Sequence, residues 1–191
     1  MATIYTIGHS TRTLDELIIA LKAHEIGILG DVRAYPASRR MPYFQGPQFP
    51  PFMTHEEGGQ QEALETTLPR AGIEYRWLRE LGGRRRKIRD DSPNLALRSP
   101  TFRNYADYML TPEFEQAIAG LLQLAATART CIMCSERQVY WQCHRMLISD
   151  YLALHGHEVL HIDDHRPAKP HRITPEASFI DGQVIYPGLF S

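Results

Sequence analysis

The sequence lacks long apolar runs, an export signal and an excess of charge of either sign. No apolar run approaches the roughly 18 residues that a membrane-spanning helix needs. The first residues have neither the basic start nor the apolar core of a secretory signal. The net charge is −1 with neutral histidines, which excludes a strongly basic body that coats nucleic acid. We therefore expect a cytoplasmic protein that does not associate with membranes.

Cysteine is also scarce, with three residues in the whole chain: Cys131, Cys134 and Cys143. An odd number of cysteines without an export signal argues against a disulfide framework, so we expect reduced thiols. Cys131 and Cys134 have the two-residue spacing of many zinc sites, but alternation along a strand would place them on opposite faces. The sequence therefore predicts neither a metal site nor a cofactor.

The residues that are present indicate a single α/β domain spanning residues 1–191. Apolar, β-branched runs predict strands at 2–7, 26–32, 72–78, 130–134 and 158–162. Apolar residues at helical spacing predict helices at 14–25, 60–71, 101–110, 111–126 and 144–155. Thr13 and Glu16 have the spacing of a capping box. This alternation predicts a three-layer, Rossmann-like fold with a mostly parallel sheet and flanking helices.

Two segments depart from the alternation. Residues 36–61 are rich in proline and glycine and predict a long loop or lid. Residues 165–191 form a C-terminal extension in which 177–186 predict a β-hairpin, because Asp181-Gly182 favours a tight primed turn. Five histidines in or near this tail are expected on a solvated surface: His155, His157, His161, His165 and His171.

Polar side chains follow the predicted strands. In an open parallel sheet, ligands bind outside the carboxyl ends of the strands, near the point where the strand order reverses. The residues concerned are Gly8, His9 and Ser10 after the first strand, Asp31 and Arg33 at the second, Cys134 and Glu136 at the fourth, and Cys143, His144 and Arg145 at the next helix. We expect these side chains to lie along one rim.

The first two groups each have a functional and a structural interpretation. The turn at residues 8–10 could present free backbone amides to an anion, or it could be a plain strand–helix turn. Asp31 and Arg33 share one face of their strand. They could address a ligand together or form an internal ion pair.

Glu136 and Cys143 are the reactive candidates. A carboxylate in a partly apolar pocket can act as acid, base or nucleophile, whereas in a loop Glu136 would only cap the next helix. A cysteine at a helix start beside His144 and Arg145 is where a thiol pKa falls, although Cys143 could instead pack inward as a small hydrophobe. Arg145 could bind a phosphate or carboxylate through two hydrogen bonds.

A basic run suggests a second surface, made of Arg84, Arg85, Arg86, Lys87 and Arg89. Such a run usually forms a solvated face, but next to Gly82-Gly83 it could grip a phosphate backbone. Arg39 and Arg40 would extend it. The nearby aromatic residues that could stack on bases are Tyr43, Phe44, Tyr75 and Trp77.

The motifs in combination are Thr6-Ile7-Gly8-His9-Ser10, Asp31-Val32-Arg33 with Pro36 and Ser38, Leu81-Gly82-Gly83, Cys134-x-Glu136, Cys143-His144-Arg145, and the ending Asp181-Gly182 with Tyr186-Pro187. Together they resemble the DUF488 family of uncharacterised bacterial and archaeal proteins, over nearly the whole chain. The resemblance implies a compact α/β domain and no particular reaction. Residues 41–57 are longer and richer in proline and glycine than expected for the family, so substrate choice could differ.

These observations support three hypotheses for function. We favour an enzyme, of hydrolase or glycosyl-transfer type, that acts on a nucleotide-like or phosphorylated small molecule at an N-glycosidic bond. Its catalytic candidates are Glu136 and Asp31, and its ligand-binding candidates are Gly8, His9, Ser10, Arg33, Ser38 and Arg145. The alternatives are a thiol enzyme, with Cys143 as nucleophile and His144 as base, and a nucleic-acid or nucleotide binding module without catalysis.

Overall fold

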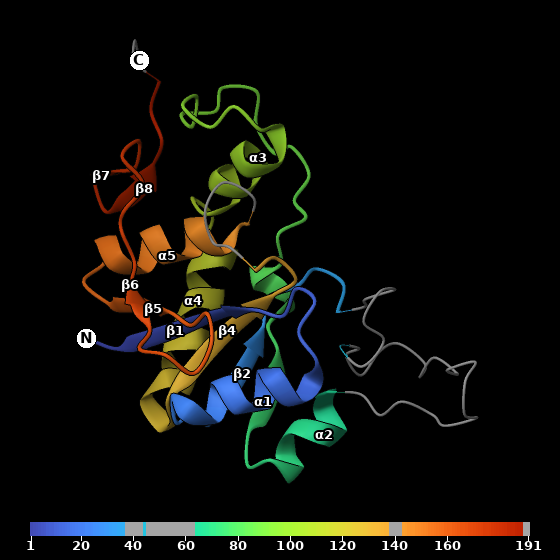
Figure 1. Cartoon of the computed structure of the whole chain (residues 1–191). Coiled ribbons are helices and arrows are strands. Elements are labelled where there is room, and N and C mark those ends of the chain that lie inside the picture. The colour runs from blue at the N-terminus through green and yellow to red at the C-terminus, as the bar shows by residue number, and fades with distance from the viewer. Residues whose placement is uncertain (37–43, 45–63, 138–142, 189–191) are drawn as a thin grey trace.

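A six-stranded sheet forms the centre of the molecule (Figure 1). The computed structural model describes residues 1–36, 44, 64–137 and 143–188. The strand order is β3-β2-β4-β1-β5-β6. The strands are β1 (Thr3–Gly8), β2 (Ile28–Asp31), β3 (Glu74–Trp77), β4 (Thr130–Cys134), β5 (Glu158–His161) and β6 (Lys169–Pro170). Every pairing in this sheet is parallel except that of β6 with β5, which confirms the predicted sheet.

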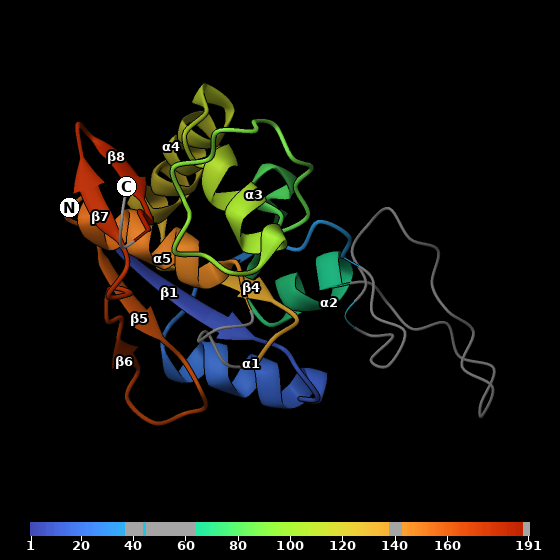
Figure 2. The same ribbon diagram turned by 90° about the horizontal axis from the view of Figure 1, so that it is seen from above.

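Helices cover both faces of the sheet, as Figures 1 and 2 show. One face carries α1 (Leu14–Ala23) and α2 (Leu64–Arg70), and the other carries α3 (Pro100–Tyr108), α4 (Pro112–Thr127) and α5 (Arg145–Leu154). Leu17 of α1 packs in the same apolar cluster as Leu29 of β2. Leu147 of α5 packs in the other cluster with Ile132 of β4. The predicted three-layer architecture is therefore confirmed.

The strand order reverses between β1 and β4, which are direct neighbours and align Gly8 with Cys134. The chain leaves β1 through α1 toward β2, on one side of this pair. It leaves β4 through α5, on the opposite face of the sheet, toward β5 on the other side. Connections that diverge in this way open a crevice at the carboxyl ends of the two strands, which is where ligands bind in such folds.

Helix α1 shows how local sequence sets the element boundaries. The Thr13 hydroxyl accepts a hydrogen bond from the Glu16 amide at 3.1 Å, and the Glu16 carboxylate accepts one from the Thr13 amide at 2.8 Å. This confirms the predicted capping box. The helix ends at Ala23, earlier than predicted, because Glu25 takes a φ of 54° and the Ile26 amide turns back to the Leu21 carbonyl. The second strand consequently begins only at Ile28.

The C-terminal extension folds onto the domain. Strands β7 (Ser178–Ile180) and β8 (Gln183–Ile185) form the predicted hairpin. Its turn has φ values of 52° at Asp181 and 79° at Gly182, as a primed turn requires. Just after it, Tyr186 is fully buried against the α4 and α5 side of the core. Strand β6 was not predicted, because Lys169-Pro170 carries no strand signal.

Most of the predicted loop at 36–61 lies outside the described residues, together with Ser38, Arg39, Arg40 and Tyr43. Within the part of the chain that the structure describes, no helix is both long and apolar enough to cross a membrane.

Candidate functional site

A pocket of about 450 Å³ opens at the carboxyl ends of β2 and β4. Thr101 and Phe102 of α3, and Cys143 and His144 just before α5, line its other sides. Its lining residues are Arg33, Ala34, Tyr35, Gly83, Arg84, Thr101, Phe102, Cys134, Ser135, Glu136, Cys143 and His144. Five of the candidate rim residues thus surround one cavity, although they are spread over more than 100 positions of the sequence.

Two thiols lie together at the base of this pocket. The Sγ atoms of Cys134 and Cys143 are 2.7 Å apart. The Nε atom of Arg145 donates to both sulfurs, at 2.9 Å and 3.4 Å respectively. The backbone amide of Arg145 also points at the Cys143 sulfur, 3.4 Å away. Both sulfurs therefore lie against a buried cation, and Cys143 additionally lies at the positive end of α5.

The two thiols differ in acidity. Burial raises the pKa of Cys134 well above its ordinary value, and its hydrogen bond to Cys143 raises it further. Burial also acts to raise the pKa of Cys143. The hydrogen bonds of Cys143 with Cys134 and His144, and the charge of Arg145, outweigh burial and hold its pKa well below the ordinary value. These opposite directions favour Cys143 as the thiolate of the pair and Cys134 as the S–H donor.

His144 is oriented for proton transfer with Cys143. Its Nε2 atom lies 2.8 Å from the Val32 carbonyl oxygen. A carbonyl only accepts hydrogen bonds, so Nε2 carries a proton, and Nδ1 is the nitrogen that exchanges a proton with Cys143, donating to the thiolate when the ring is an imidazolium. That Nδ1 atom is 4.0 Å from the Cys143 sulfur. The ring packs directly on Gly83, where an added Cβ would lie 2.4 Å from Nδ1, so this position needs glycine.

Asp31 and Arg33 form an internal ion pair. Arg33 Nε lies 2.8 Å from Asp31 Oδ1, and the Tyr75 hydroxyl donates to Asp31 Oδ2 at 2.8 Å. The Asp31 side chain is fully buried. Arg33 Nη1 donates to the Phe44 carbonyl at 2.8 Å. The geometry therefore fits an internal ion pair better than a pair that binds a ligand. Arg33 also lines the pocket, but its charge is balanced by Asp31.

His9 belongs to the same internal network. Its Nδ1 lies 3.1 Å from the Ser10 carbonyl, and its ring stacks on Phe44 with centroids 4.2 Å apart. Burial and the nearby charge of Arg33 lower the pKa of His9 to about 4. The imidazole is therefore neutral near pH 7 and faces Arg33 Nη1 through Nε2, at 3.4 Å.

Of the two interpretations of the turn after β1, the anion-binding one needs free amides at His9 and Ser10. The amides of His9 and Ser10 donate to the carbonyls of Cys134 and Ser135, at 3.0 Å and 2.9 Å. They extend the β1–β4 ladder by two residues and are not available to an anion. Position 8 needs glycine because the Glu136 main chain lies directly against it. A Cβ at this position would lie 1.7 Å from the Glu136 carbonyl oxygen.

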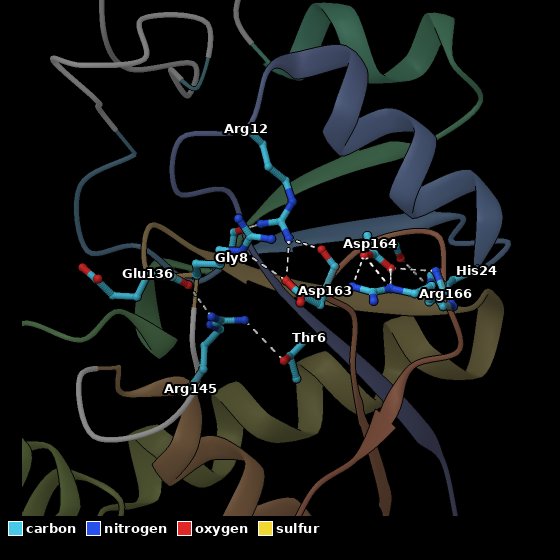
Figure 3. Close-up of polar contacts among 10 residues, drawn as sticks. Thr6, Gly8, Arg12, His24, Glu136, Arg145, Asp163, Asp164 and Arg166 are labelled. Carbon is cyan, nitrogen blue, oxygen red and sulfur yellow. Dashed lines mark hydrogen bonds and ion pairs between the residues drawn. The ribbon is translucent and has the colours of Figure 1, made fainter.

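Glu136 reaches the pocket from an exposed position. Its main-chain carbonyl accepts a hydrogen bond from Arg145, while its carboxylate points away from that contact (Figure 3). Among the residues that the structure describes, none provides the apolar enclosure that we considered for this carboxylate.

Arg145 lies inside the protein and not in the pocket lining. Its three guanidinium nitrogens all donate internally. Nε donates to the two sulfurs, Nη1 to Thr6 Oγ1 at 3.3 Å, and Nη2 to the Glu136 carbonyl; the last two contacts are drawn in Figure 3. Only 1% of the residue is exposed. Bidentate binding of a ligand phosphate, which we had considered for Arg145, would require these bonds to break.

The comparison with protein families identifies the chain's relatives. The family model described as "Domain of unknown function DUF488" matches residues 50–152, which is more than half of the chain. The chain belongs to the DUF488 family. Searches of curated proteins and of solved structures found no significant match. The matched part of this DUF488 chain includes Cys134, Cys143, His144 and Gly83, and therefore most of the pocket.

Sequence reasoning missed a buried hydrogen-bonded chain in this DUF488 protein, which we call the relay. It runs from Thr6 through the imidazoles of His161 and His171 to the carboxylate of Asp150, with successive distances of 2.8, 2.9 and 2.8 Å. At its other end, Thr6 accepts from Arg145. The prediction that both histidines lie on a solvated surface is wrong. Their partners are as many as 155 positions away in the sequence, and no local pattern signals such a contact.

The basic run of this DUF488 protein is partly engaged within the fold. Arg85 Nε donates to the Gly82 carbonyl at 3.0 Å, and its guanidinium lies 3.7 Å from the centre of the Tyr108 ring. Lys87 pairs with Asp90 at 2.5 Å. Arg84 and Arg86 are exposed, and Arg84 lies over the Tyr35 ring at the pocket.

Two of the aromatic residues that we considered for base stacking are buried. Phe44 and Tyr75 are in the core beside α1 and α2. They cannot present their ring faces to a nucleic acid.

Among the described residues, no group of three or more histidine, cysteine, aspartate or glutamate side chains is placed to hold a metal ion.

Proposed function

We propose that this DUF488 protein is an enzyme that uses Cys143 as a thiolate nucleophile on a small anionic ligand. The observation that carries the proposal is the arrangement of Cys143, His144 and the Val32 carbonyl. A nucleophile beside a base, with the base oriented by a third group, is the recurring design of nucleophilic catalysis. The pocket brings this arrangement within reach of a small molecule.

The charge in the pocket wall favours an anionic ligand. The charge of Arg33 is balanced by Asp31, but Arg84 is exposed at the opening. A phosphate or carboxylate of the ligand would bind beside Arg84, which fits a nucleotide-like or phosphorylated compound. The ligand's electrophilic carbonyl carbon would then lie near the Cys143 sulfur.

The proposed reaction is acyl transfer to water. In the resting pair, Cys143 is a thiolate and His144 an imidazolium. The Cys143 sulfur forms a bond to the carbonyl carbon, and the leaving group departs with the imidazolium proton, which leaves His144 neutral. The thioester is then cleaved by a water molecule that gives a proton to His144, which releases the acid and restores the thiolate. This assigns Cys143 as nucleophile and His144 as acid and base.

Alkylation with two matched probes tests this proposal. Iodoacetamide is neutral and iodoacetate is anionic, and both alkylate thiolates. We expect Cys143 to react with an apparent pKa below the ordinary value of about 8.5, and His144→Asn to raise that value. We also expect a preference for iodoacetate that Arg84→Ala abolishes. Arg86→Ala is the matched control, because Arg86 belongs to the same run and does not line the pocket.

Two outcomes would overturn the proposal. One is a Cys143 thiol that titrates at the ordinary value in the folded protein. The other is a pH profile of alkylation that His144→Asn leaves unchanged. Each experiment is carried out in a protein that carries Cys131→Ser, because Cys131 is buried on the other side of the sheet and does not line the pocket.

A second candidate function is cleavage of an N-glycosidic bond with Glu136 as the acid, base or nucleophile. The observation in its favour is that Glu136 lines the same pocket. The Glu136 side chain is exposed, whereas burial normally tunes such a carboxylate, so we rank this function second. Release of free base from a panel of nucleosides and nucleotides, lost in Glu136→Gln and retained in Cys143→Ser, would favour it over the thiol reaction.

A further inference from the structure

The second thiol of the pocket, Cys134, makes and breaks no bond to the ligand in the reaction proposed above. It sits at the end of β4 with its sulfur 2.7 Å from that of Cys143. We propose that Cys134 and Cys143 form a reversible dithiol–disulfide pair that is oxidised by hydrogen peroxide or another small hydroperoxide. This inference uses the same pocket and does not depend on the acyl-transfer reaction.

The geometry is close to that of the oxidised form. A disulfide requires its sulfurs to be about 2.05 Å apart. The two sulfurs therefore need to approach by well under 1 Å, a movement that side-chain rotation can supply. The third thiol cannot compete, because Cys131 lies in the apolar cluster beneath α1 and α2 while Cys134 and Cys143 lie in the cluster beneath α4 and α5.

The environment assigns the attacking and the resolving sulfur. Both sulfurs accept from Arg145 Nε and from a backbone amide, that of Glu136 for Cys134 and that of Arg145 for Cys143. Cys143 is distinguished by His144 Nδ1, 4.0 Å away, and by its place at the start of α5, so it is the sulfur that carries the negative charge. Cys134 keeps its proton and directs it at Cys143. A deprotonated sulfur with a protonated partner in contact is the arrangement of a peroxidatic and a resolving cysteine.

The oxidation of the two thiols takes place in two steps. The Cys143 thiolate attacks one oxygen of hydrogen peroxide, the O–O bond breaks, and the released hydroxide takes a proton from the solvent to form water. Cys143 is now a sulfenic acid. The Cys134 sulfur attacks the Cys143 sulfur, and the departing hydroxide takes the Cys134 proton as a second water. Two thiols have lost two electrons to the peroxide, and a dithiol such as dithiothreitol returns them by exchange.

Access explains the choice of a small oxidant. Both cysteines line the pocket, yet each residue is only 2% exposed. A hydroperoxide can reach the sulfurs along the cavity, whereas a disulfide on a folded protein cannot. The oxidised pair has no free thiolate, so oxidation would also suspend any reaction that needs Cys143.

The test uses the full chain in its reduced form. The protein is exposed to hydrogen peroxide, free thiols are blocked with N-ethylmaleimide, and peptides are mapped by mass spectrometry. We expect a Cys134–Cys143 disulfide in the wild-type protein and in Cys131→Ser, reversed by dithiothreitol. In Cys134→Ser we expect Cys143 to stop at the sulfenic acid and to react with dimedone.

The inference is overturned if Cys131→Ser forms no disulfide, or if dimedone fails to label Cys143 in Cys134→Ser while circular dichroism shows that variant to be folded. The redox inference fails while the acyl-transfer proposal stands if Cys143 still prefers iodoacetate and has a low apparent pKa but no disulfide forms. The reverse pattern, a disulfide without any effect of His144→Asn on alkylation, would overturn the acyl-transfer reaction and leave the redox pair standing.

Discussion

Acidification should unfold this protein more readily than its modest charge suggests, because two buried histidines must remain neutral. Burial and the charge of Arg33 lower the pKa of His9 to about 4. Burial and the charge of His171 lower that of His161 to about 3. In the unfolded chain both titrate near the ordinary value of about 6.5. Between these values the unfolded chain binds a proton at each site that the folded protein does not bind.

The size of the effect follows from this difference. Above about pH 6.5 both states are neutral and the two sites do not affect stability. As the pH falls below that value the unfolded state gains protons, so stability decreases until the folded pKa is reached. From about pH 7 to about pH 5, each site should cost about 2 kcal/mol of unfolding free energy. The two together would remove a substantial part of the 5–15 kcal/mol that is typical of a domain.

Urea unfolding at the two pH values measures this loss. The informative variant is His161→Asn, which is expected to be less stable at both pH values because it breaks contacts with Thr6 and His171. Its additional loss on going from about pH 7 to about pH 5 should nevertheless be about 2 kcal/mol smaller than that of the wild-type protein. His165→Asn, at an exposed position, is the control and should keep the full loss. A pH-dependent loss in His161→Asn equal to that of the wild-type protein would refute the reasoning.

Two further predictions concern the pocket and its support. Asp31→Asn should lower the unfolding free energy by about 3–5 kcal/mol, because it leaves Arg33 charged and buried; urea unfolding should show that the pair Asp31→Leu with Arg33→Met recovers most of the loss, and a double variant no better than the single one would contradict this. Gly83→Ala should displace the His144 ring and raise the apparent pKa of Cys143 toward about 8.5, measured by iodoacetamide alkylation, and an unchanged pH profile would show that the ring position does not matter.

The sequence predicts the elements well where the signal is local. The capping box at Thr13 and the Asp181-Gly182 turn each involve neighbouring residues, and both occur as predicted. The alternation of strands and helices was sufficient to predict the parallel sheet, because crossover connections make few topologies feasible. The same logic brought the strand ends together, so that Cys134 and Cys143 meet at one pocket.

What the sequence cannot supply is the choice of partner. Asp31 was considered as a catalytic residue, yet it is enclosed by Arg33 and by Tyr75, which lies 44 positions away. Arg145 seemed suited to a ligand phosphate, yet all three of its guanidinium nitrogens donate inside the protein. A charged residue looks the same in a sequence whether its partner is a ligand or a distant side chain, and only the fold decides between them.

The close approach at Gly8 has a mechanical consequence. There is no room for a side chain between this residue and the Glu136 carbonyl, and the next two amides are bonded to the loop after β4. The loop after β1 is therefore joined by two hydrogen bonds to the end of β4 and the loop that follows it, beside this close approach. A ligand that displaces the pocket wall at residues 134–136 must move the start of the α1 connection with it, or break these contacts. Ligand binding in the pocket would thus alter the structure on the opposite face of the sheet. We expect it to change the hydrogen-exchange rates of the Thr11 and Arg12 amides.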